Sequence, residues 1–144
     1  MYKYFLILFP FFSVAQEVFK PLAQPVELFP VAVEAYMKAD GHLDEPAWKH
    51  AKSVFLNFQV EPFQGQKASF SSEVKVLYNQ QYLYVGAILK DTIGRNRFRS
   101  PNLKRDYVFG ENDLFGLALD GFSDKRNAIV LQSNAYGAQR DLLS

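Results

Sequence analysis

Side chains suited to acid–base chemistry are few in this chain and are poorly spaced for catalysis. The two histidines, His42 and His50, lie in one short segment, and His42 follows a glycine in a turn, which is typical of a solvated loop residue. Asp113 and Asp120 could act as acid and base on a glycoside, but seven residues of extended strand would separate them by over about 20 Å. The chain has no cysteine nucleophile. We therefore assign no catalytic residue.

Aspartates at the ends of predicted strands could instead bind a hard cation. Calcium prefers six to eight oxygen ligands, which carboxylates and carbonyls supply. Packed sheets could bring together Asp91, Asp106, Asp113 and Asp120. We take three of them as candidate metal ligands, namely Asp91, Asp113 and Asp120. The alternative for each aspartate is a turn cap or a salt bridge to Arg97 or Arg105.

The framework that must position these residues centres on a predicted β-hairpin over residues 73–90. Residues 73–78 and 82–90 alternate between apolar and other side chains, with Asn79-Gln80-Gln81 between them. This pattern is typical of two antiparallel strands joined by a turn. A period of two directs Glu73 and Lys75 to water and one apolar row to a core. That row comprises Val74, Val76, Tyr78, Leu83, Val85, Ala87 and Leu89.

The same alternation recurs on both sides of this hairpin. Residues 55–60 predict one more strand, residues 112–120 and 128–134 predict a second hairpin, and another strand begins near Arg140. Residues 91–106 have no apolar period and predict a long surface loop. We therefore predict an all-β fold, an antiparallel β-sandwich of the immunoglobulin-like or jelly-roll type. Such a sandwich needs further strands to cover its open edge, so we expect the chain to be incomplete at its C-terminus.

One short helix is predicted near Trp48. Asp44 can cap its start, and Pro46 suits its first turn. Ala47, Trp48 and Ala51 then fall on one side at helical spacing. We interpret Trp48 as a core anchor, because an amphipathic turn points its aromatic ring inward; the alternative is a ring that stacks on a sugar.

The first 38 residues are predicted to precede the domain. Residues 1–15 combine an early lysine, an apolar run and small residues at the two positions that a signal peptidase reads before Gln16. The run is shorter than the roughly 20 residues that a membrane-spanning helix needs. Residues 16–38 carry three prolines and predict an extended leader, with an edge strand over residues 32–37. We expect export to the periplasm, the outer membrane or the extracellular space.

Composition excludes several classes of function. Without residues 1–15 the chain has 15 basic and 15 acidic residues, so its net charge gives no case for binding nucleic acid. The absence of cysteine excludes disulfides, thiolate metal sites and a lipid-modified N-terminal cysteine. The domain must therefore be stabilised by packing.

A series of motifs over residues 39–141 resembles a known family. It begins with Asp40-Gly41-His42-Leu43-Asp44-Glu45-Pro46-Ala47-Trp48 and continues with Val74-Lys75-Val76-Leu77-Tyr78 and Tyr82-Leu83-Tyr84-Val85. It is completed by Asp91, Arg105-Asp106, Asn112-Asp113, Leu119-Asp120, Asp124-Lys125-Arg126, Asn134, Gly137 and Asp141. In this order the motifs resemble the family 9 carbohydrate-binding module. The version they resemble most stands at the front of large secreted bacterial proteins whose remaining length resembles an outer-membrane-type β-barrel.

The resemblance implies a β-sandwich outside the cytoplasm that binds glycan without catalysis of its own, with structural calcium in some members. In sugar-binding members, two aromatic side chains, typically tryptophans, clamp a sugar unit. Here Trp48 belongs to the structural Glu-Pro-Ala-Trp element, so Tyr107, Phe109 or Tyr136 would have to substitute. The aspartate that usually follows the first hairpin strand is Asn79 in this sequence.

A site for a polysaccharide or oligosaccharide needs a flat aromatic face and planar polar groups. Residues of these kinds lie near strand ends, and we take as candidate carbohydrate-binding residues Tyr107, Phe109, Arg105, Asp106, Asn134 and Tyr136. The alternative for the aromatic ones is burial in the core.

Three functions remain open at this stage. The first is a module over residues 39–144 that holds a larger protein at its polysaccharide. The second is a docking domain that packs on a membrane barrel of the same parent chain without binding sugar. The third is part of a glycoside hydrolase whose catalytic region lies beyond Ser144. The exposure of the three candidate aromatic rings in one concave patch would favour the first function over the second.

Overall fold

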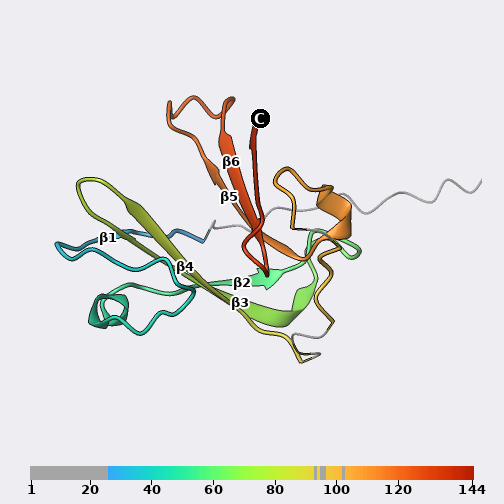
Figure 1. The fold of residues 1–144 in the computed structure, drawn as a ribbon, viewed down its shortest axis with the longest axis horizontal. Coiled ribbons are helices and arrows are strands. Elements are labelled where there is room, and N and C mark those ends of the chain that lie inside the picture. Colours follow the sequence, from blue (N-terminus) through green and yellow to red (C-terminus); the bar gives the residue numbers. More distant parts are fainter. Residues whose placement is uncertain (1–25, 93, 95–96, 102) are drawn as a thin grey trace, which may run out of the picture.

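The computed structural model describes residues 26–92, 94, 97–101 and 103–144. These residues form two β-sheets joined by loops and single turns of 3-10 helix (Figure 1). The predicted all-β class and the mostly antiparallel sandwich are confirmed. The predicted signal peptide, residues 1–15, and the leader up to residue 25 lie outside the described residues. Within the described part, no helix has the length and apolar character needed to cross a bilayer.

The first sheet, which we call sheet A, is built around its longest strand, β3 (Lys67–Tyr78). The antiparallel strand β4 (Leu83–Leu89) pairs with β3 from Ser72↔Leu89 to Tyr78↔Leu83, which confirms the predicted hairpin. Strand β2 (Val54–Phe58) also pairs antiparallel with β3. A short strand, β1 (Val31–Ala32), pairs parallel with the end of β3. The edge strand predicted over residues 32–37 therefore lies earlier and is shorter.

Asn79 closes the β3–β4 turn. Its backbone N–H donates to the Tyr82 carbonyl at 2.9 Å. Its Oδ1 accepts the backbone N–H groups of Gln81 and Tyr82 at 2.9 and 2.8 Å. An asparagine side chain can accept these turn hydrogen bonds in the same way as an aspartate. Asn79 can therefore play the structural role of the aspartate that the resemblance leads us to expect here.

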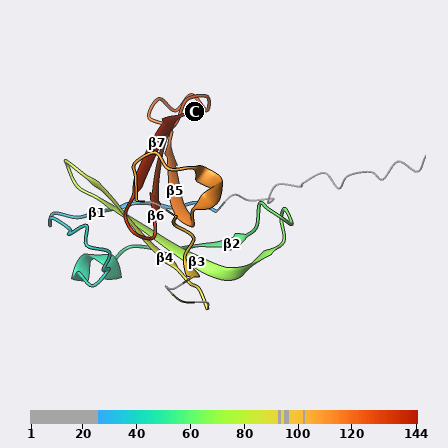
Figure 2. The same cartoon turned by 45° about the vertical axis from the view of Figure 1, so that its right-hand side comes forward.

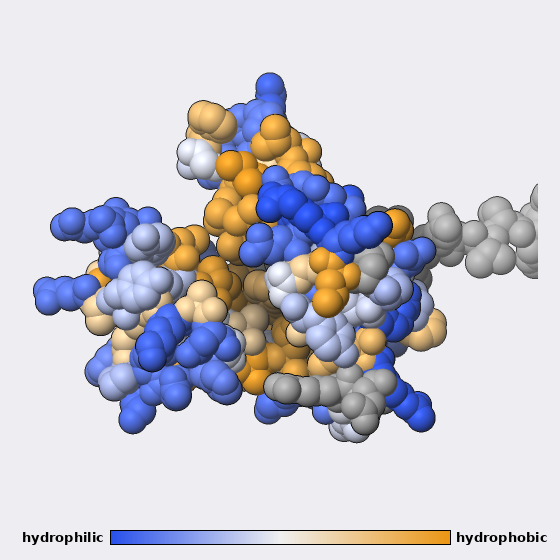
Figure 3. Space-filling model, viewed as in Figure 1, coloured by the Kyte–Doolittle hydropathy of each residue, from blue (hydrophilic) through white to orange (hydrophobic). Residues whose placement is uncertain are grey.

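The second sheet, sheet B, is a meander of β5 (Leu114–Leu119), β6 (Ile129–Asn134) and β7 (Gln139–Leu143). This confirms the predicted second hairpin and the strand near Arg140. Sheet B rises at a steep angle from sheet A in both ribbon views (Figures 1 and 2). Apolar side chains of the two sheets, including Leu83, Val85 and Phe115, line a cavity of about 560 Å³. Figure 3 shows that the surface is hollowed near the centre of this view, with apolar residues at the base of the hollow.

The most deeply buried core lies on the face of sheet A that carries Leu77, which is fully buried. Met37, Trp48 and Ala51 pack around it. The structure thus confirms Trp48 as a core anchor. It also corrects the prediction for β3, because the sequence placed this face toward water; both faces of β3 are covered, since Val74 and Val76 on the other face are buried too.

Glu73 and Lys75, which were predicted to face water, are only about one-fifth exposed, at 21% and 22% of their side-chain surface. They form an ion pair with 3.5 Å between Lys75 Nζ and Glu73 Oε1. Ser53 Oγ donates a hydrogen bond to Glu73, and Lys75 Nζ donates to the Trp48 carbonyl. Both charges therefore sit beneath residues 48–53, where polar partners compensate for their partial burial.

The predicted short helix is one 3-10 turn, η1 (Pro46–Lys49). Its N-cap is Glu45 rather than the predicted Asp44. The Glu45 carboxylate accepts the Lys38 backbone N–H and the Trp48 Nε1–H, each at 3.0 Å. These hydrogen bonds, first that from Lys38, lower the pKa of Glu45 below its ordinary value of 4.5. Glu45 thereby fixes both the preceding segment and the buried indole.

Candidate functional site

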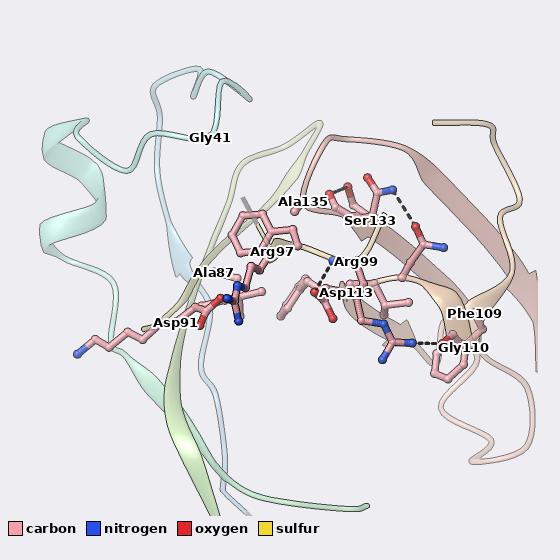
Figure 4. Close-up of a pocket in the computed structure, with 17 residues that line it drawn as sticks. Gly41, Ala87, Asp91, Arg97, Arg99, Phe109, Gly110, Asp113, Ser133 and Ala135 are labelled. Atoms are coloured by element: carbon pink, nitrogen blue, oxygen red, sulfur yellow. Dashed lines mark hydrogen bonds between the residues drawn. The ribbon is translucent and has the colours of Figure 1, made fainter. Parts of the chain in front are cut away.

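A groove of about 1080 Å³ lies where the long loop after β4 meets the ends of both sheets (Figure 4). Sheet A contributes Ala87 and Leu89, and sheet B contributes Ser133 and Asn134. The loop contributes two arginines, Arg97 and Arg99, and the 3-10 turn that begins at Phe109 closes one end. Parts of both sheets, the loop between them and Gly41 thus build one concave surface.

Phe109 is the aromatic residue best placed to contact a ligand in this groove. It opens the turn η3 (Phe109–Glu111), lines the groove and is 56% exposed. The guanidinium carbon of Arg140 lies 5.9 Å from the centroid of its ring, within the range of a cation–π contact. Arg140 therefore supports the ring from sheet B while a large part of the side chain stays accessible.

The loop is held to the start of β5 by paired hydrogen bonds between Arg99 and Asp113. The Arg99 N–H donates to Asp113 Oδ2 at 2.8 Å, and the Asp113 N–H donates to the Arg99 carbonyl at 2.7 Å. The Arg99 guanidinium also donates to the Gly110 carbonyl at 2.7 Å. Figure 4 shows these groups at the centre of the groove. They place a guanidinium and a carboxylate between Phe109 and sheet A.

Asn134 shapes the groove from beneath. It is 5% exposed, and its Nδ2 donates to Ser100 Oγ at 2.6 Å and Asn112 Oδ1 at 3.3 Å. Its Oδ1 accepts the backbone N–H groups of Tyr136 and Ala138 at 3.1 and 2.9 Å. An asparagine amide has two donors and two acceptor positions, so these four bonds use its full capacity. Asn134 therefore positions the loop and does not offer a group to a ligand.

Three other predicted carbohydrate-binding residues lie apart from the groove. Tyr107 is 4% exposed, so its ring offers no open face; its hydroxyl has no hydrogen-bond partner within the described part, and burial raises its pKa. Arg105 pairs with Asp141 beside β7 and borders the cavity between the sheets. Asp106 forms an ion pair with its neighbour, with 3.8 Å between Arg105 Nε and Asp106 Oδ2, and its backbone N–H donates to the Gln139 carbonyl.

Tyr136 follows β6 and is 58% exposed, but it is not part of the groove lining. The three candidate aromatic residues are therefore not gathered in one concave patch. Phe109 lies on the groove, Tyr136 lies outside it, and Tyr107 is buried.

The three candidate metal ligands do not all lie at the groove either. Asp91 and Asp113 both line the groove, whereas Asp120 lies at the other end of β5. Asp120 accepts the backbone N–H groups of Lys125, Phe122 and Asp124, and these bonds lower its pKa, with Lys125 the largest contributor. It thus acts as a turn cap, the alternative given for it from sequence. No group of three or more His, Cys, Asp or Glu residues suited to a metal occurs among the described residues.

Sequence reasoning did not identify Arg99 as a groove residue. The basic stretch around it was interpreted as a surface loop, and only the position of the loop against β5 shows that its guanidinium faces the groove. Arg99 stands between Phe98 and Ser100 in a loop without an apolar period. Nothing in that local sequence distinguishes it from the other arginines of the loop.

The model of one protein family, described as carbohydrate family 9 binding domain-like, matches residues 39–111, just over half of the 144 residues. The chain belongs to the carbohydrate family 9 binding domain-like family. This finding confirms the resemblance inferred from the order of motifs and supports carbohydrate binding as the class of function. The matched region of this family 9 domain includes strands β2, β3 and β4 of sheet A, the loop with Arg99, and Phe109. No curated protein and no solved structure matches the chain.

Proposed function

We propose that this chain is a non-catalytic module that binds a polysaccharide or oligosaccharide in the groove beside η3. The observation that carries the proposal is the accessible Phe109 ring on a groove of about 1080 Å³ in a chain of this family. A flat ring can pack against the C–H face of a sugar, while the side chains of Arg99 and Asp113 can bind its hydroxyl groups.

The size of the groove favours an oligosaccharide segment over a single sugar. Small-molecule sites typically enclose about 300–1,000 Å³, and this groove, at about 1080 Å³, lies just above that range. Its lining also mixes apolar side chains from β4 with charged groups from the loop, among them Arg97 and Arg99. Such a surface suits a chain of sugar units, each of which presents both C–H and hydroxyl groups.

The groove is the one place where we propose that the chain binds calcium. Asp91 and Asp113 are the two predicted ligands that share this surface. Two carboxylates alone fall short of the six to eight oxygens that calcium prefers, so carbonyl groups of the loop or the bound sugar would have to complete the site. A rise in melting temperature with calcium, but not with magnesium, would support this part of the proposal.

We further propose that the module acts outside the cytoplasm and holds a larger parent protein at its polysaccharide. The support for export is the signal-peptide pattern of residues 1–15. The docking function is the alternative, and two observations favour it: the three candidate aromatic rings do not share one concave patch, and apolar side chains are exposed on both sheets. These include Leu83, Leu89, Ile129, Leu131 and Leu143.

Thermal melting in the presence of oligosaccharides tests the proposal. A ligand that binds only the folded state stabilises it by mass action. We expect the melting temperature of the full chain to rise with at least one of cellulose, xylan or mannan oligosaccharides. A cooperative melt that none of these sugars shifts would instead favour docking against the rest of the parent protein.

A further inference from the structure

We infer that the end of the β3–β4 hairpin carries a second sugar-binding surface, formed by Tyr36, Tyr82 and Tyr84. The inference rests on the proposed function, because it assigns the same class of ligand to a separate place on the domain. None of these tyrosines was a candidate from sequence. The hairpin end and the segment with Tyr36 both lie at the left of Figure 1, away from η3.

The three rings form one cluster. Tyr36 contacts Tyr82 edge to face, with 5.9 Å between ring centroids and planes at 80°. It contacts Tyr84 in the same manner, at 6.5 Å and 87°. Tyr82 and Tyr84 are 5.9 Å apart. These are the separations and orientations that aromatic rings prefer, so each ring restricts the others.

The cluster is anchored at one side and open at the other. Tyr84 is partly buried against the core around Leu77, and its hydroxyl accepts a hydrogen bond from Asn79 Nδ2 at 3.1 Å. Tyr36 is 71% exposed and Tyr82 is 50% exposed. A ligand would therefore meet rings that are already held in place, which reduces the entropy lost on binding.

The chemistry of the cluster fits a sugar better than a purely apolar ligand. The exposed rings of Tyr36 and Tyr82 can pack against the C–H surface of a sugar, and their phenol hydroxyls can donate and accept hydrogen bonds. The side-chain amide of Asn79 lies at the edge of the cluster and positions the Tyr84 hydroxyl there. Apolar rings beside uncharged hydroxyl and amide groups match a neutral oligosaccharide.

The cluster and the groove are separate surfaces. Tyr84 pairs with Leu77 in β3, so its side chain lies on the Leu77 face of sheet A. Tyr82, which directly precedes β4, contacts the Tyr84 ring on that side. Ala87 and Leu89, which line the groove, fall on the opposite face. The domain would thus have two independent contacts for one polysaccharide, and linked contacts strengthen overall binding.

Isothermal titration of the full chain with cellopentaose, xylopentaose and mannopentaose tests the inference. We expect two binding sites per chain for at least one sugar. Tyr36→Ala should weaken one site by at least about fivefold and leave the other unchanged. Tyr36→Phe, which keeps the ring face, should retain most of the affinity. Phe122→Ala, at an 84% exposed position in the β5–β6 turn, is the control and should leave both sites intact.

The outcomes separate this inference from the proposed function. If Tyr36→Ala changes nothing while Phe109→Ala abolishes the only site, the tyrosine surface is refuted and the groove stands. If Tyr36→Ala removes the only site while Phe109→Ala has no effect, the tyrosine surface stands and the groove is refuted. Binding of no sugar by the wild-type chain would overturn both. Because Tyr36 is mostly exposed, the variant should melt at the wild-type temperature, which confirms its fold.

Discussion

At the scale of single residues, Glu45 joins the leader to the buried tryptophan, and its protonation should weaken that link. Its pKa in the folded chain lies below 4.5, mainly because the carboxylate accepts the Lys38 N–H. The ionised Glu45 carboxylate therefore stabilises the folded chain. This contribution to the free energy of unfolding is present above pH 4.5 and is lost as the pH falls through the lower pKa of the folded state.

We accordingly predict that the stability of Glu45→Gln will depend less on pH than that of the wild-type chain. Melting temperatures measured between neutral pH and about pH 3 should converge for the two proteins at the acid end. Glu61→Gln, at an exposed position in the β2–β3 turn, is the control and should follow the wild-type curve. Equal pH dependence of the wild-type and Glu45→Gln proteins would contradict this account of Glu45.

Gly86 is required by the close packing of the core against β4. A Cβ atom at this position would lie 2.8 Å from Leu43 Cδ2 and 3.1 Å from Trp48 Cη2. Both distances are shorter than ordinary van der Waals contact, and the Trp48 ring is buried, so it has little room to move.

Gly86→Ala should therefore lower the free energy of unfolding by about 1–3 kcal/mol, the usual cost of overpacking. The matched control is Gly116→Ala, in strand β5, where the nearest atom to the new Cβ is the flexible Gln132 Cγ at 3.4 Å. Urea unfolding should show a loss for the first variant and little change for the second. Equal midpoints for both variants would refute the packing argument.

At the scale of elements, the groove exists because Asn134 ties the long loop to sheet B. Replacement by alanine would leave two backbone N–H groups and the side chains of Ser100 and Asn112 without this partner. Buried groups that lose a partner cost more than exposed ones, which water can satisfy.

Asn134→Ala should therefore destabilise the chain by about 2–3 kcal/mol and weaken sugar binding at the groove. Asn127→Ala is the control, because Asn127 bonds Asp124 in an exposed turn and its loss should cost less than about 1 kcal/mol. Chemical denaturation measures both changes. Wild-type stability in Asn134→Ala would show that the network does not hold the loop.

The strands could be predicted from sequence because alternation is a local signal. It located β3, β4, β5 and β6 and the turn at Asn79. The faces of β3 could not be assigned in the same way, since Leu77 shares its face with the polar Lys75 and becomes buried only when residues 37–51 fold over it. The cap at Glu45 was missed for a similar reason, because its partner Lys38 lies seven residues earlier.

At the scale of the whole molecule, the sites could be predicted only in part. Of the residues named from the sequence, Phe109, Asp91 and Asp113 line the groove; their part in sugar or cation binding stays a prediction. The sequence could not show that Tyr107 is buried, nor that Tyr36 meets Tyr82 across the end of the hairpin. These outcomes depend on how loops pack on the sheets, and neither residue type nor spacing encodes that packing locally.

Export is a second property of the whole chain. We predict that a bacterial host will secrete the protein and remove residues 1–15, so that the exported form begins at Gln16. Mass spectrometry of the exported protein would show the new N-terminus, with the cytoplasmic precursor as its control. An intact N-terminal segment on exported protein would contradict the signal-peptide interpretation.

The most direct test of the central claim is titration of Phe109→Ala with the oligosaccharide that binds the wild-type chain most tightly. Loss of the exposed ring should weaken binding at the groove by about tenfold or more. Val108→Ala is the matched control, because Val108 is the neighbouring residue, is 61% exposed and does not line the groove. Our account predicts that Phe109→Ala loses affinity while Val108→Ala keeps it. Wild-type affinity at every site of Phe109→Ala would contradict sugar binding at the groove.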